Sequence, residues 1–108
     1  MTSRRRASRL GASFVPVPSA AVHTVEIDGE AVLLDQVANR LHHLNPTATL
    51  VWACLDGQAS IAEITVDLSA GLGAPHDRVL ADTLAVTRML GEEGLLANVE
   101  PAPHPADG

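Results

Sequence analysis

The stretch Leu44–Gly57, LNPTATLVWACLDG, marks a change from strand to helix and so decides the order of elements in this chain. Asn45 can accept hydrogen bonds from the free amides of the following turn, and Pro46 stands where a missing N–H costs nothing. Gly57 can adopt the left-handed conformation that stops a helix. The stretch therefore predicts a short, complete helix between Pro46 and Gly57.

Three strand-like runs precede this helix. Residues 23–27 and 30–35 alternate apolar with polar side chains, and Asp28-Gly29 between them is typical of a tight hairpin turn. Asn39 can accept a positive φ in the next connection, before a third run at residues 40–44. We therefore expect a three-stranded antiparallel meander.

Two further helices are predicted after the first. Ser60 and Glu63 form a capping-box pattern, and the helix that they start is closed by Gly71 and Gly73. A third helix begins near Pro75 and is followed by apolar residues that can fold back on the core. Its expected core stripe is Val79, Thr83, Val86 and Leu90, flanked by Leu80, Leu84 and Thr87. The predicted fold is α+β and winged-helix-turn-helix-like: a three-stranded antiparallel sheet followed by three helices.

The two ends of the 108-residue chain lack a sustained apolar period. Residues 1–21 are predicted to be a flexible basic segment, and residues 100–108 a disordered tail rich in proline and alanine. Residues 22–99 then form one small domain. A domain of this size has little volume for a deep catalytic pocket, so surface binding is the expected mode of action.

Charge and composition exclude several classes of function. The formal charge is −6, and only three arginines outside the cluster Arg4, Arg5, Arg6 and Arg9 face thirteen acidic residues. The third helix balances Arg78 and Arg88 against Asp77 and Asp82, whereas a DNA-reading helix needs a positive surround. No apolar run approaches the ~20 residues of a membrane span, and there is a single cysteine. We expect a cytoplasmic protein without nucleic-acid or membrane partners.

No residue pattern predicts catalysis, a metal site or a cofactor. His42 and His43 are neighbours on a strand, so their imidazoles point to opposite faces. Cys54 lies among apolar residues without an evident base, and Gly71-Leu72-Gly73 lacks the lysine of a phosphate-binding loop. We therefore expect a protein that is not an enzyme.

Several short words in the sequence, taken in order, resemble the PqqD family of peptide-binding proteins. The words are Val25–Asp35, Leu44–Ala48, Trp52, Leu55–Gly57 and Gly94–Leu96. The resemblance implies a non-catalytic chaperone that binds the leader segment of a ribosomal precursor peptide and presents it to a modifying enzyme, such as a radical-SAM protein or a protease. The alternative is a winged-helix regulatory domain that binds DNA or a protein partner.

The resemblance also implies a binding site. In that family the leader adds as a strand to the third strand of the sheet, and the third helix forms the other wall of the groove. By position, the edge residues are Arg40, Leu41, His42, His43 and Leu44, and the helix wall comprises Leu80, Leu84, Thr87 and Arg88.

Overall fold

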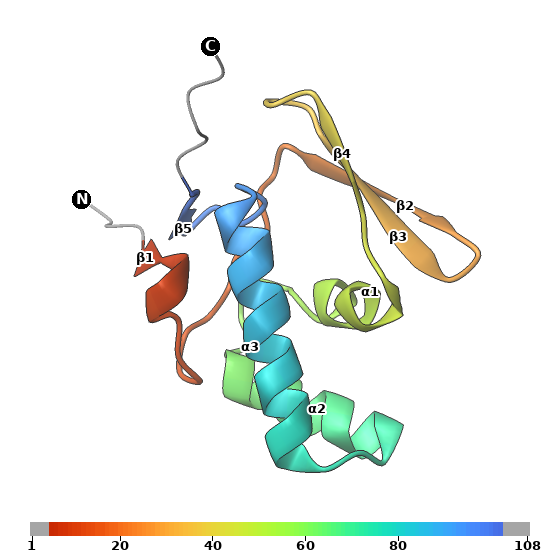
Figure 1. Cartoon of the computed structure of the whole chain (residues 1–108), viewed down its shortest axis with the longest axis vertical. Coiled ribbons are helices and arrows are strands. Elements are labelled where there is room, and N and C mark those ends of the chain that lie inside the picture. Colours follow the sequence, from red (N-terminus) through yellow and green to blue (C-terminus); the bar gives the residue numbers. More distant parts are fainter. Residues whose placement is uncertain (1–4, 103–108) are drawn as a thin grey trace.

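A three-stranded antiparallel sheet precedes three helices in this chain, as predicted (Figure 1). The computed structural model describes residues 5–102. The α+β, winged-helix-like fold class is confirmed. In chain order the elements are β1 (Arg5–Arg6), the 3-10 helix η1 (Ala7–Arg9), β2 (Val22–Ile27), β3 (Glu30–Asp35), β4 (Arg40–His43), α1 (Pro46–Ala53), α2 (Ile61–Leu72), α3 (His76–Glu92) and β5 (Val99–Glu100).

The main sheet has the strand order β2-β3-β4, with both pairs antiparallel. Asp28 and Gly29 form the first turn with φ angles of 52° and 80°. Positive φ at both central residues matches the turn to the right-handed twist of the strands. Asn39 has a φ of 54° in the second connection. The predicted meander and its two turn signals are therefore confirmed.

The helix starts also follow the sequence signals. The Asn45 side chain accepts a hydrogen bond from the N–H of Ala48 at 2.8 Å. Ser60 and Glu63 form the reciprocal capping box, at 3.1 and 2.9 Å. The end of α1 differs from the prediction: the helix stops at Ala53, because the next two amides bond back three residues rather than four. Gly57, with a φ of 76°, belongs to the following loop.

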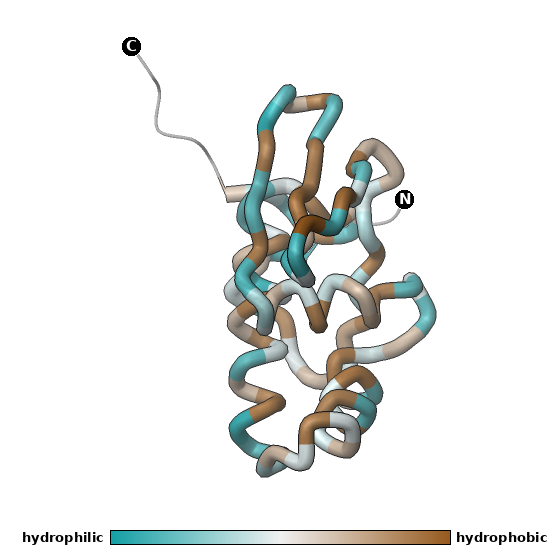
Figure 2. The backbone as a smooth tube through the Cα atoms, turned by 90° about the vertical axis from the view of Figure 1, so that its right-hand side faces the viewer, coloured by the Kyte–Doolittle hydropathy of each residue, from teal (hydrophilic) through white to brown (hydrophobic). Residues whose placement is uncertain are grey.

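The helices cover one face of the sheet. Along β3, Ala31, Leu33 and Asp35 are buried and the residues between them are half-buried. Figure 2, viewed from the sheet side, shows hydrophobic and hydrophilic residues alternating along the strands. Leu95 and Leu96 fold back on the core as predicted. The largest fully buried hydrophobic side chains are Leu33, Val51, Ile61, Ile64, Leu90, Leu95 and Val99.

The prediction that residues 1–21 stay outside the domain is wrong for the part that the structure describes. Residues 5–18, which we call the N-terminal strap, run along the side of α3 that faces away from the sheet (Figure 1). Leu10 and Phe14 of the strap are 2% and 9% exposed. The strap begins at β1, which pairs in parallel with β5, so the domain runs from residue 5 to at least Glu100. Residues 1–4, including Arg4, and 103–108 lie outside the described part.

Hydrogen bonds explain how the part of the strap after η1, which has no regular secondary structure, is fixed. The carbonyls of Ala12 and Phe14 accept bonds from Ala62 and Ile61, at 2.8 and 2.9 Å, in the first turn of α2. These helical amides have no partner within their own helix. The Asn98 side chain accepts from the Val17 amide at 3.0 Å and donates to Val15 at 2.8 Å. The strap thus satisfies backbone groups that the rest of the fold leaves unpaired.

Candidate functional site

β4 is an edge strand of the sheet, and some of its backbone groups face away from β3. Leu44 donates its N–H to the carbonyl of Ala31 at 2.8 Å, and this bond sets the phase of the β3-β4 ladder. In an antiparallel pair, successive residues direct their backbone groups alternately toward and away from the partner strand. His42 therefore bonds toward β3, whereas Leu41 and His43 direct their N–H and C=O groups outward. An extended peptide can pair with these two residues.

The side chains of β4 divide between the two faces of the sheet. Leu44, at 3% exposed, belongs to the core, and His42 is half-buried on the same face. The Nε2 atom of His42 is buried without a hydrogen-bond partner among the described residues. Leu41, at 69% exposed, and His43 lie on the outer face, where His43 Nε2 is 3.1 Å from a carboxylate oxygen of Glu30.

The opposite edge of the sheet, along β2, is arranged differently. Gln36 donates to the carbonyl of Ala21 at 3.2 Å, so Thr24 and Glu26 are the β2 residues whose backbone groups point outward. The indole N–H of Trp52 in α1 donates to the Thr24 hydroxyl at 2.9 Å. The β2 edge is therefore approached by α1, and the β4 edge lies on the side of α3.

One side of α3 faces β4. The carboxylate of Glu93, directly after the last helical residue, lies 3.6 Å from the guanidinium of Arg40 at the start of β4. Residues three or four positions apart share a helix face, so Met89, Val86 and Asp82 lie on this side as well. We call these four residues the open flank. Met89 is 36% exposed and Val86 is half-buried, which gives this flank an accessible apolar strip.

The predicted wall residues of α3 lie on another side of the helix. Arg88 donates to the carbonyl of Leu10 in the strap at 3.2 Å. Leu84 and Leu80 precede it by one and two turns, and both pack against the core. We call Leu80, Leu84 and Arg88 the covered flank. A separation of five residues, as between Arg88 and Glu93, turns the helix by about 140°, so the two flanks face different neighbours.

The structure buries one residue of the predicted helix wall. Thr87 is 0% exposed and its hydroxyl donates to the carbonyl of Thr83 at 2.7 Å, so it is a core residue. Arg88 bonds to the strap, and Leu84 packs against the core. The sequence analysis did not single out Met89 and Val86, which lie on the side of α3 that faces β4. The opposite charges of Glu93 and Arg40, at the end of the helix and at the start of the edge strand, were a signal for this side.

A pocket of about 300 Å³ lies between α1, the end of α2 and the start of α3. Its apolar lining comes from all three helices, and Arg78 and Asp82 of α3 border it. The lining residues are Thr47, Leu50, Val51, Leu68, Leu72, Ala74, Arg78, Val79, Asp82 and Thr83.

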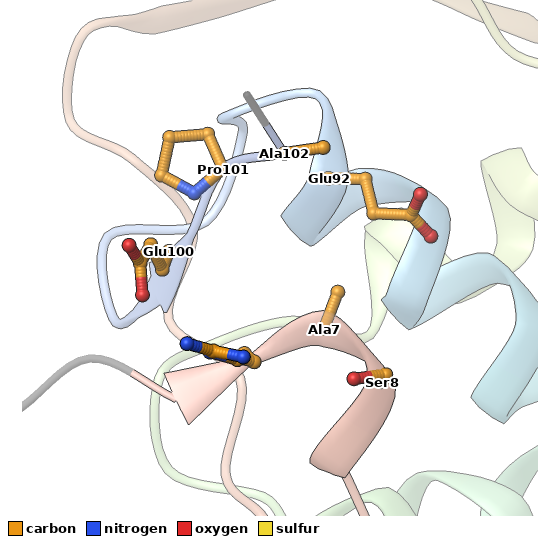
Figure 3. Close-up of a pocket in the computed structure, with 7 residues that line it drawn as sticks. Ala7, Ser8, Glu92, Glu100, Pro101 and Ala102 are labelled. Atoms are coloured by element: carbon orange, nitrogen blue, oxygen red, sulfur yellow. The ribbon is translucent and has the colours of Figure 1, made fainter. Parts of the chain in front are cut away.

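A larger pocket of about 460 Å³ lies between η1, the end of α3 and β5 (Figure 3). Arg6, Glu92 and Glu100 bring charges of both signs to its lining. The lining ends at Ala102, and the chain continues there into residues outside the described part.

The described residues contain no group of three or more histidine, cysteine or acidic side chains that could hold a metal ion. Within the same range, no helix combines the length and apolar character that crossing a membrane requires. Burial, followed by the nearby charges of Asp67 and Asp56, raises the pKa of the Cys54 thiol. A raised pKa disfavours the thiolate, which is the nucleophilic form of cysteine.

Solved structures with the same fold include two relatives of known binding type. TbiB1, in complex with the TbiA(beta) leader peptide, is 26% identical with a TM-score of 0.68, and the alignment covers 75% of this chain and 94% of TbiB1. The PqqD truncation of Methylobacterium extorquens PqqCD, a functional and stand-alone recognition element for ribosomally synthesized and post-translationally modified peptides, is 23% identical. Its TM-score is 0.72, with coverage of 83% of this chain and 96% of that one.

The sequence itself gives the family. The profile of the PqqD family, described as coenzyme PQQ synthesis protein D, matches residues 30–96. This match covers more than half of the chain, and the chain belongs to the PqqD family. A comparison with curated protein sequences gave no match.

Proposed function

We propose that this chain binds the leader segment of a ribosomal precursor peptide and presents it to a modifying enzyme, without catalysing a reaction itself. The leader adds as a strand to the edge formed by Arg40, Leu41, His42, His43 and Leu44. The open flank of α3 forms the second wall of the groove, in place of the covered flank that the sequence predicted.

The observation that carries this proposal is the outward direction of the Leu41 and His43 backbone groups beside an accessible apolar strip on α3. Backbone hydrogen bonds supply affinity in strand addition, and side-chain contacts with a neighbouring wall supply specificity. Met89 is the exposed apolar side chain of the open flank, and Leu41 of β4 is exposed on the outer face of the sheet. The complex of TbiB1 with a leader peptide supports the same use of this fold.

The proposal also covers the partner enzyme, the cellular compartment and the need for a cofactor. The partner enzyme is a radical-SAM protein or a protease, and the chain acts in the cytoplasm, where ribosomal precursors are made. It needs no cofactor of its own. Regulation through DNA is not favoured, because the third helix adds Glu92 to an already balanced set of charges and lacks a positive surround.

Proline substitution on the two sheet edges tests the proposal. Leu41→Pro removes an N–H that points away from β3, so the ladder within the sheet keeps its bonds while the added strand loses one. We expect calorimetric titration with the leader of the precursor encoded beside this chain to show at least tenfold weaker binding, or ~1.4 kcal/mol.

Glu26→Pro is the matched control, since it removes an outward N–H from the β2 edge. This variant should bind the leader as wild type does, and circular dichroism should show both variants folded. Equal affinities for the two folded variants would exclude the β4 edge as the binding site. Absence of binding by the wild-type chain would contradict the peptide-binding function itself.

A further inference from the structure

The pocket between α1, α2 and α3 has the chemistry of a receptor for one uncharged apolar side chain. Leu50 and Leu72 line it and remain 42% and 57% exposed. Val79, at 5% exposed, forms part of its buried wall. A volume of about 300 Å³ is at the lower end of the range for ligand sites, which favours a single side chain over a whole cofactor.

The charged residues of the lining support the same occupant. Arg78 and Asp82 bring one charge of each sign, so the pocket has no formal net charge that would select an anion or a cation. An ionised side chain would lose hydration on entering between the leucines without a net opposite charge to compensate. An aliphatic or aromatic side chain would gain from the burial of apolar surface.

The pocket shares a residue with the proposed peptide groove. Asp82 belongs to the open flank of α3 and also lines the pocket. On the other wall, β4 ends at His43 and leads into α1, where Thr47 is the first lining residue. A peptide that pairs with Leu41 and His43 and then continues along the groove toward α1 arrives at the pocket within a few residues.

We infer that the pocket binds an apolar side chain of the leader peptide, located just outside the segment that pairs with β4. This inference rests on the proposed leader-binding function and adds a specificity-determining contact to it. The paired segment is read mainly through its backbone, whereas the pocket selects one residue by size and lack of charge.

The pocket can be tested without a leader peptide. N-acetyl-leucinamide and N-acetyl-tryptophanamide, at millimolar concentration, should shift the amide NMR signals of pocket residues such as Leu50, Leu72 and Val79 in the wild-type chain. N-acetyl-glycinamide, which has no apolar side chain, should not. Failure of both apolar amides to shift these signals would overturn the pocket assignment and leave the proline test of the β4 edge unaffected.

Two variants on α2 form a matched pair for the same measurement and for leader titration. Leu72→Asp places a carboxylate at the pocket, whereas Val66→Asp changes a residue of equal exposure, 56%, that is not part of the lining. Leu72→Asp should weaken leader binding at least about tenfold and abolish the shifts caused by the amides. Val66→Asp should change neither. Suppose that Leu72→Asp and Val66→Asp bind the leader equally well while Leu41→Pro no longer binds it. That result would exclude the pocket as a binding site and leave strand addition to β4 intact.

Discussion

The two flanks of α3 carry similar apolar residues but have different neighbours. On the covered flank, Arg88 donates a hydrogen bond to Leu10 of the N-terminal strap and Leu84 packs against the core. The open flank presents Met89 and Glu93 to the side of β4, and Glu93 forms an ion pair with Arg40. The hydrophobic pattern of a helix thus indicates which side chains are suited to burial. It does not indicate whether the chain itself or a bound peptide buries them.

The largest effect on stability is expected when the packing of the strap is removed. Phe14→Ala deletes a 9% exposed ring, and we expect it to lower the free energy of unfolding by about 3–5 kcal/mol through the cavity it leaves. Chemical denaturation followed by circular dichroism measures this. An unchanged midpoint would show that the strap is not part of the core. Leader affinity of the folded fraction should stay near the wild-type value, because the ring does not line the groove.

Aspartate on each flank separates folding from binding. Leu84→Asp places a charge among partly buried apolar groups, and we expect it to cost about 1–3 kcal/mol of stability with little effect on the affinity of the folded protein. Met89→Asp lies on the 36% exposed strip and should weaken leader binding more than tenfold, ~1.4 kcal/mol. Its stability should stay within about 0.5 kcal/mol of wild type. The reverse pattern would assign the groove to the flank that we describe as covered.

The smallest expected effect concerns the ion pair that joins α3 to β4. Glu93→Gln removes the charge opposite Arg40, and both side chains are more than a third exposed, so the loss of stability should be at most about 1 kcal/mol. Glu92→Gln is the control, because it removes the same charge from the neighbouring residue, whose carboxylate lines the pocket shown in Figure 3. If the two variants still differ in their free energy of unfolding at high salt, Glu93 acts through more than its charge.

Much of the fold could be predicted because its signals are local. The Asp28-Gly29 turn, the Asn45 cap and the Ser60–Glu63 capping box each depend on residues a few positions apart, and each is present in the structure. The choice of the third strand as the binding edge had another source, the resemblance to the PqqD family.

The strap and the choice of flank could not be predicted in this way. The strap has prolines at residues 16 and 18, and its buried residues follow no strand or helix period. The strands β1 and β5 that anchor it are only two residues each. The amides of Ile61 and Ala62 that hold it belong to a distant part of the chain. If the strap is left out of account, Leu84 and Met89 are equally suitable as part of a binding surface. The sequence therefore leaves the two flanks equivalent, and tertiary packing distinguishes them.

The pairing of β1 with β5 has a consequence for the order in which the protein is completed. Arg5 pairs with Val99, so a strand that is synthesised early in this domain has its partner more than ninety residues later in the chain. The sheet and the helices can assemble during synthesis, whereas the strap has no complete docking site until β5 has emerged. A nascent chain therefore carries Leu10 and Phe14 exposed until β5 has been made, and the two sides of α3 become different from each other only then.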